Sequence, residues 1–126
     1  MKAFNFSLNT LLKVKSHAFE KDALSLARLQ KRMHQLNERK QELQETFEEL
    51  LEASITMPSL SQNLELVSGK IAIVEEEIRR EKRLIAECRK SVTNSLNKRK
   101  VVEKIKENHY ALYQKECVRL NETSAN

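Results

Sequence analysis

Side chains that could bind a metal or act as acids, bases or nucleophiles are few in this chain of 126 residues. The histidines are His17, His34 and His109, and we expect none of them to have a second ligand one helical turn away. Glu75, Glu76 and Glu77 are consecutive, so a helix would spread them about 100° apart rather than pair them. With a single glycine, Gly69, no glycine-rich loop can hold a phosphate. We therefore expect no enzyme, no metal site and no cofactor.

The two cysteines, Cys88 and Cys117, fall within one expected helix. Their spacing corresponds to roughly 43 Å along a helix, whereas a disulfide needs Cα atoms within about 7 Å. Free cysteines of this kind are typical of a reducing compartment. The longest strongly apolar run, Ile71 to Val74, is too short to span a membrane, and polar residues interrupt the first turns, so no signal peptide is expected. We expect a cytoplasmic protein.

The elements that carry these residues are helices with a heptad repeat. Charged residues make up 33% of the chain and aromatic residues 5%, and glycine and proline occur once each, which favours long helices over sheets. Alternating steps of three and four in the first half reach fourteen seam positions, ten of them apolar. They are Leu8, Leu12, Lys15, Phe19, Asp22, Leu26, Leu29, Met33, Leu36, Lys40, Leu43, Phe47, Leu50 and Ser54. This repeat predicts a coiled coil.

A second heptad array follows the only proline, Pro58. Its seam positions are Leu60, Leu64, Val67, Ile71, Val74, Ile78, Glu81, Ile85, Cys88 and Val92. Beyond Val92 the apolar residues no longer fall on one heptad phase, so we expect a less regular register there. Pro58 must end the first helix, and Ser59 with Gln62 has the spacing of a capping box for the second. Pro58 and Ser59 therefore form the expected hinge.

A connection this short predicts that the two helices fold back on one another. The expected fold is all-α, a single domain over 1–126, with helices at about 6–53 and 60–120 joined by a hinge at about 54–59. Residues whose numbers add up to about 114 should face one another across this antiparallel coiled-coil hairpin. Leu36 should then lie near Ile78, and Leu43 near Ile71. The second helix should project beyond the first.

The net charge of +5 conceals two oppositely charged halves of the hairpin. Near the hinge, residues 38–52 carry six acids and two bases, and residues 62–78 carry four acids and one base. Away from the hinge, residues 8–35 carry six bases and two acids, and residues 79–106 carry eleven bases and three acids. Such a distribution suits two different partners, because the summed field steers association. The alternative is that each charged run is simply a solvated helix face.

A few apolar residues near the hinge lie off the seam. Leu51, Ile55, Leu66 and Ile73, together with Phe47 and Leu50, are candidates for an exposed docking patch. Packing against the hinge loop explains them equally well.

Nucleic-acid binding is one alternative for the basic half, since lysines along a helix can neutralise phosphates. Few aromatic residues accompany these bases, and no motif for reading a groove is present, so we expect no nucleic-acid partner.

The opening stretch FNFSLNTLLKVKSHAFEKDALSLARLQ, residues 4–30, resembles the FliJ family of flagellar export proteins and the YscO-type stalk proteins of type III secretion. The pattern that carries the resemblance consists of Phe4, Phe6, Leu8, Leu11 and Leu12. It covers about a fifth of the chain, and the rest is similar in length and in having two long helices with a short break.

The resemblance implies an antiparallel coiled coil similar to the γ-subunit stalk of rotary ATPases. Such proteins insert into a hexameric export ATPase, promote its assembly and hydrolysis, and link it to the membrane-embedded export gate. They also escort export chaperones, and they work in the cytoplasm at the periphery of the membrane export apparatus.

From charge and expected exposure, we assign the ATPase-ring contact to basic residues of both helices. They are Lys13, Lys15, Lys21, Arg28, Lys98, Arg99, Lys100 and Lys104. The export-gate contact is assigned to Phe47, Leu50, Leu51, Leu66 and Ile73. A coiled-coil adaptor or export chaperone that does not stimulate an ATPase is the other hypothesis, and a basic nucleic-acid-binding coiled coil is the third.

Overall fold

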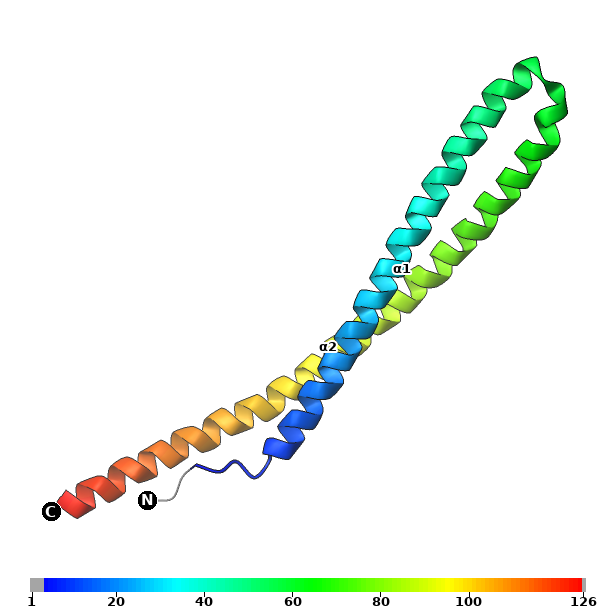
Figure 1. Ribbon diagram of the computed structural model, residues 1–126. Helices are drawn as coiled ribbons and strands as arrows, with labels where there is room; N and C mark the ends of the chain where they lie inside the picture. The colour runs from blue at the N-terminus through cyan, green and yellow to red at the C-terminus, as the bar shows by residue number, and fades with distance from the viewer. Residues whose placement is uncertain (1–3, 126) are drawn as a thin grey trace. The chain divides into compact units, whose positions relative to one another are not determined.

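The computed structural model describes residues 4–125, with side chains to residue 123, and in this range the chain is all-α. Helix α1 spans Asn9–Thr56, the 3₁₀ helix η1 spans Pro58–Leu60, and helix α2 spans Ser61–Ala125. The two helices run antiparallel and pack against each other on either side of the short connection (Figure 1). The predicted helical hairpin is thus confirmed.

The helix boundaries differ from the expected ones by a few residues. Helix α1 begins at Asn9 rather than near residue 6, because residues 4–6 have no regular secondary structure and residues 7 and 8 form a turn. The amide of Asn9 donates a hydrogen bond to the carbonyl of Phe6 (3.0 Å), which starts the helix. At the other end α1 continues to Thr56, and the Met57 amide donates to the Ala53 carbonyl (3.0 Å).

The capping box predicted at Ser59 is wrong. Ser59 lies inside η1, and α2 begins two residues later at Ser61. Met57 has φ −130° and ψ 84° and turns the chain out of α1, and Pro58 then occupies the first position of η1. The amides of Leu60 and Ser61 donate to the carbonyls of Met57 and Pro58, so the 3₁₀ turn satisfies donors that a serine cap would have satisfied. Proline fits here because its missing N–H would have had no helical partner.

Both helices contribute to two compact units. The hinge unit comprises Ser25–Arg89. The terminal unit comprises the chain up to Leu24 together with the chain from Lys90 onward. Each unit is an antiparallel pair of helical segments.

The hinge unit holds the larger apolar core, on the predicted seam. Its buried members are Leu43, Val67, Val74 and Ile78, and Met33, Leu36, Phe47, Leu50 and Ile71 pack against them. Two ion pairs cross this seam, Arg32 with Glu81 and Lys40 with Glu75. Their residue numbers add up to 113 and 115, so the predicted antiparallel register is correct.

Beyond Val92, where we expected a less regular register, α2 continues the heptad phase with polar side chains. The contacts that cross this part of the seam join residues whose numbers add up to 117 and 118, so the pairing is shifted from that of the hinge unit. Ser95 donates a hydrogen bond to Asp22 across the seam, and the Arg99 guanidinium lies 5.6 Å from the centre of the Phe19 ring. Val102, one heptad after Ser95, is buried. The seam was hidden in the sequence because polar residues occupy it.

Aromatic residues attach the N-terminal segment to α2 in the terminal unit. Phe6 is 2% exposed and meets the His109 ring edge-on, with ring centres 5.5 Å apart. Phe4 contacts Tyr110 and Tyr113 at 5.0 and 5.4 Å between ring centres. Burying Phe6 removes a large apolar surface from water, so this contact stabilises the start of the chain against α2.

Candidate functional site

Seven of the eight basic residues assigned to the ATPase-ring contact belong to the terminal unit. They are Lys13, Lys15, Lys21, Lys98, Arg99, Lys100 and Lys104. Arg28 is exposed and belongs to the hinge unit, so it is not placed with the others.

The seven are not equally available to a partner. Lys13, Lys21, Lys98 and Lys100 are exposed. Lys15 is half-buried on the seam. Lys104 is exposed, but its Nζ lies 3.8 Å from Oε2 of Glu107 and forms an ion pair with it.

Arg99 is a structural side chain of the seam. It stacks on Phe19, and its Nε donates to Glu103 Oε1 at 2.8 Å. Its charge is therefore partly neutralised, and its removal would disturb the helix pair.

The apolar set assigned to the export gate is divided by the structure. Phe47 and Leu50 are half-buried and pack against the core of the hinge unit. Leu51, Leu66 and Ile73 remain exposed, at 50%, 65% and 62% of their surface. Ile55, at 80%, is more exposed still. Phe47 and Leu50 were predicted both as seam positions and as members of the patch, and the structure places them on the seam, which faces the partner helix.

The exposed residues of this set also lie on two different sides of the helix pair. We call the side formed by residues one position before a seam residue the leading side, and the side formed by residues one position after it the trailing side. In an antiparallel pair, the leading residues of both helices share one side. Viewed from one end, residue numbers increase clockwise around one helix and anticlockwise around the other. A shallow cleft in the hinge unit illustrates this, since Arg32 of α1 lines it together with Glu77 and Leu84 of α2.

Leu66 and Ile73 precede Val67 and Val74 and are leading residues, whereas Leu51 follows Leu50 and is a trailing residue. The predicted gate patch is therefore two small apolar surfaces, one on each side.

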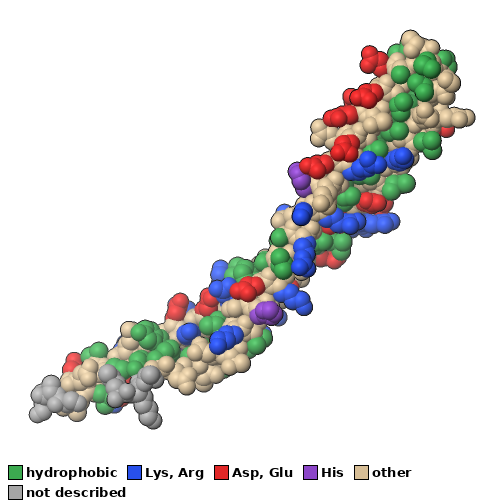
Figure 2. All heavy atoms as spheres, in the orientation of Figure 1, with side chains coloured by type: hydrophobic (Ala, Val, Ile, Leu, Met, Phe, Trp, Pro, Cys, Tyr) green, Lys and Arg blue, Asp and Glu red, His purple; other side chains and the backbone are tan. Residues whose placement is uncertain are grey.

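Exposed acidic residues adjoin Leu51 and Leu66 in the sequence. Glu48, Glu49, Glu52 and Glu65 are all exposed. On the face shown in Figure 2, acidic side chains gather in the part of the molecule near the hinge.

Farther along α2, Glu76 is surrounded by arginines. Its Oε2 accepts hydrogen bonds from Nε and Nη2 of Arg79 at 2.9 and 2.7 Å, and Arg80 and Arg83 each approach to 3.8 Å. The hydrogen bonds and the charge of Arg79 hold the pKa of Glu76 below its ordinary value.

Glu81 is the one buried charged residue among those that the structure describes. It is 3% exposed, and its Oε2 lies 3.3 Å from Nε of Arg32. Its Oε1 is buried and has no hydrogen-bond partner. The seam pattern placed Glu81 correctly but gave no sign that one carboxylate oxygen would be unpaired.

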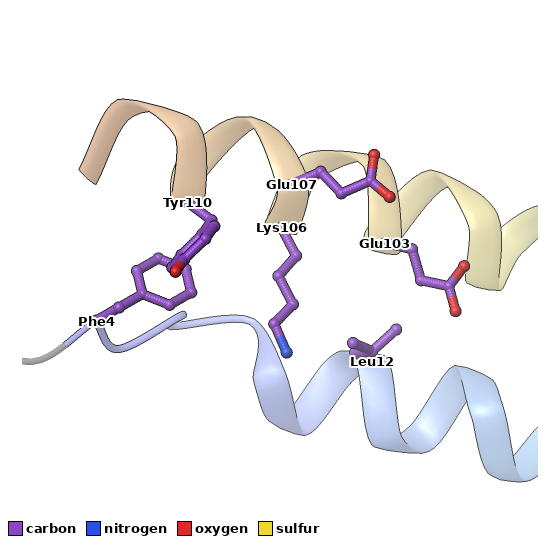
Figure 3. A pocket seen from close by; sticks show the side chains of 6 residues that line it. All are labelled: Phe4, Leu12, Glu103, Lys106, Glu107 and Tyr110. Carbon is purple, nitrogen blue, oxygen red and sulfur yellow. The ribbon is translucent and has the colours of Figure 1, made fainter. Parts of the chain in front are cut away.

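A cleft of about 510 Å³ opens in the terminal unit beside the N-terminal segment. It is lined by Phe4, Leu12, Glu103, Lys106, Glu107 and Tyr110. In Figure 3 the Phe4 and Tyr110 rings lie against each other at one end, Leu12 points up from α1, and Lys106 reaches down from α2 toward α1. The sequence offered one indication of this arrangement, the alternation of Phe4 and Phe6 ahead of the first heptad.

One expectation about metal-ligand spacing is wrong. His34 does have a second ligand type one turn away, because its Nε2 lies 2.9 Å from Oε1 of Glu38. Both side chains are exposed and only two ligands meet, and no group of three or more histidine, cysteine or acidic side chains is found among the described residues. Between residues 4 and 125, neither helix contains a stretch long and apolar enough to cross a bilayer.

Comparison of the chain with protein-family models, with curated proteins and with solved structures found no match.

Proposed function

We propose that this chain is the central stalk and escort component of a type III, flagellar-type protein export apparatus. In this proposal the terminal unit inserts into a hexameric export ATPase and promotes its assembly and activity. The hinge end contacts the membrane-embedded export gate, and export chaperones are further partners. The resemblance of residues 4–30 to the FliJ family motivates the proposal.

The observation that carries the proposal is the extent of α2 in the terminal unit. Phe4 reaches Tyr113, and α2 continues beyond it to Ala125. A helical pair with one helix extended past the other is the form that a stalk needs to enter a ring. Exposed lysines on the same unit, Lys98 and Lys100 among them, give it positive charge that would attract acidic surfaces of the ring.

An asymmetric helix pair cannot make equal contacts with six subunits at once. If its contacts differ in free energy between the conformations of a subunit, the stalk shifts the populations of those conformations. Stimulation of hydrolysis then requires no catalytic group from this chain.

The test is ATP hydrolysis by the purified cognate export ATPase, with and without this protein, while light scattering follows ring assembly. We expect stimulation that saturates near one chain per six ATPase subunits. An active ATPase that shows no change in rate or assembly would overturn the proposal and leave the coiled-coil adaptor as the better account.

The charge contribution is tested with a triple variant, Lys98→Gln, Lys100→Gln and Lys104→Gln. Arg99 is left in place because it stacks on Phe19. The matched control replaces three exposed lysines of the hinge unit, Lys31, Lys70 and Lys82, by glutamine. Loss of stimulation in the first variant only supports ring contact by the terminal unit. Equal loss in both contradicts it, and loss of nucleic-acid binding without loss of stimulation favours the nucleic-acid hypothesis.

A further inference from the structure

The leading side of the terminal unit combines exposed aliphatic residues with lysines. On α1, Leu11 and Val14 precede the seam residues Leu12 and Lys15, and they are 39% and 57% exposed. On α2, Val101 and Leu112 precede Val102 and Tyr113, and they are 59% and 63% exposed. The contacts of Asp22 with Ser95 and of Phe19 with Arg99 hold these segments of α1 and α2 side by side, and the leading residues of both helices share one side, so both helices contribute to one apolar strip.

In part of this unit the acids are confined to the trailing side and the seam, whereas lysines lie on both sides. Within residues 9–24 and 91–115 the leading side carries Lys21 and Lys98, and Lys115 continues the α2 stripe three residues after Leu112. These segments contain four acids, and none is a leading residue. Glu20, Glu103 and Glu107 are trailing residues, and Asp22 lies on the seam, where it accepts a hydrogen bond from Ser95.

We propose that this leading side is a docking surface for an anionic lipid bilayer, bound peripherally at the headgroup level. Aliphatic side chains beside lysines, without acids, have the composition of an interfacial helix face. Lysines suit this role because their aliphatic stems lie along apolar surface while the ammonium groups reach lipid phosphates. Lys98 and Lys115 have no ion pair among the side chains that the structure describes.

The charge pattern selects this occupant over a second copy of the chain. The acids that a neighbouring copy would present from its hinge unit are spread over both sides of the helix pair, with Glu42 and Glu49 on the leading side and Glu48 and Glu65 on the trailing side. A bilayer presents a continuous negative surface that matches an acid-free strip running along two helices. The proposal does not depend on the ATPase, so its outcome and that of the stalk proposal are measured separately.

The experiment is flotation of the full chain with vesicles of phosphatidylcholine alone and of phosphatidylcholine mixed with phosphatidylglycerol. We expect binding to the anionic vesicles only, and binding that weakens as salt is added. Absence of binding to the anionic vesicles at low salt would overturn the proposal.

Two double variants locate the surface. Lys98→Gln with Lys115→Gln should weaken binding about thirtyfold, from the contribution that each lysine makes near anionic lipid. The matched control, Lys13→Gln with Lys100→Gln, changes the net charge equally on the trailing side and should leave binding within about threefold. Equal loss in both would mean that total charge governs binding, and it would contradict the proposed face.

A second pair tests the apolar strip. Val101→Gln with Leu112→Gln should weaken vesicle binding about tenfold or more. Glutamine is a good helix former, so these changes should leave α2 helical. Leu66→Gln with Ile73→Gln, which removes exposed aliphatic residues from the hinge unit, should not. Circular dichroism checks that each variant stays helical. If the chain instead self-associates, and the Val101 and Leu112 changes abolish that association without any vesicle binding, a second copy occupies the face and the lipid proposal fails.

Discussion

At the scale of single residues, Glu81 is an exception to the apolar seam of the hinge unit. One oxygen of its carboxylate pairs with Arg32, and the other is buried without a partner. A half-satisfied buried carboxylate destabilises the folded state relative to an apolar side chain of similar size. Its pairing with Arg32 favours one register of the two helices, because only that register brings Glu81 opposite Arg32.

We therefore predict that Glu81→Leu raises the free energy of unfolding by about 1–3 kcal/mol. Arg32→Ala should lower it by about 1–2 kcal/mol, because the buried carboxylate then loses its cation. Arg39→Ala, which breaks the surface pair with Glu42, is the control and should change it by less than about 0.5 kcal/mol. Urea unfolding measures all three. A less stable Glu81→Leu variant would show that Glu81 contributes more than register.

Glu76 gives a prediction about pH. Since its pKa is lowered in the folded chain, chiefly by the hydrogen bonds from Arg79, its contribution to stability is present above the unfolded-state pKa. That contribution is lost as the pH falls through the lower folded-state value. In an NMR titration of the carboxyl carbons, Glu76 should titrate below the ordinary value of a glutamate side chain. Arg79→Gln should move its midpoint up, and Arg83→Gln should move it less. A midpoint that Arg79→Gln does not raise would contradict this cause.

At the scale of elements, the N-terminal segment is fixed to α2 mainly by one side chain. Phe6 is the most buried large residue that the structure describes, and its ring partner His109 is exposed. Attachment of residues 4–8 therefore depends mainly on Phe6, with a smaller contribution from the contacts of the half-buried Phe4.

Phe6→Ala should detach this segment without unfolding the hinge unit. Removing a buried phenylalanine costs about 3–5 kcal/mol in a closed core, but here the loss is limited by the free energy of releasing the segment. Hydrogen exchange should accelerate in the first turns of α1 and around residues 102–113, with no change in the hinge unit. Phe6→Leu should retain most of the protection. Faster exchange throughout Ser25–Arg89 would contradict local attachment.

The helices and their pairing could be predicted from sequence because apolar residues repeat every three to four positions over most of the hinge unit. All fourteen seam positions predicted in the first half are buried or half-buried, the polar ones included. Two features could not be predicted. The spacing of Ser59 and Gln62 does not distinguish a capping box from a 3₁₀ turn, since Pro58 can precede a cap or begin such a turn. The polar seam around Ser95 and Arg99 gives no periodic apolar pattern.

The candidate sites were predicted less well than the fold. Net charge per segment identified the basic and acidic halves, but it could not show that Arg99 stacks on Phe19 or that Leu51 and Leu66 lie on opposite sides. The stacking of Arg99 and the sides of Leu51 and Leu66 depend on which residues form the seam and which flank it. In the terminal unit, the seam residues are known only from the observed register.

At the scale of the whole molecule, electrostatics should govern how fast the chain finds a partner. Residues 38–52 and 62–78 have an excess of acids, and residues 8–35 and 79–106 an excess of bases. If the terminal unit meets an acidic ring surface, association should slow as ionic strength rises, because the Debye length falls from about 10 Å at 0.1 M to about 3 Å at 1 M.

We predict that the protein concentration giving half-maximal ATPase stimulation rises with salt. For the variant with Lys98, Lys100 and Lys104 replaced by glutamine, it should rise less steeply. The variant with Lys31, Lys70 and Lys82 replaced should follow the unmodified chain. Identical salt curves for all three proteins would show that these charges do not steer association.

The antiparallel pairing also determines how the chain would respond to mechanical load. Both described ends, Phe4 and Ala125, belong to the terminal unit. A force that draws them apart would load the interhelical contacts one layer at a time, as in unzipping, rather than shearing all layers together. The aromatic contacts of Phe4 and Phe6 would yield first, then the polar layers of Asp22 with Ser95 and Phe19 with Arg99, and the apolar core of the hinge unit last.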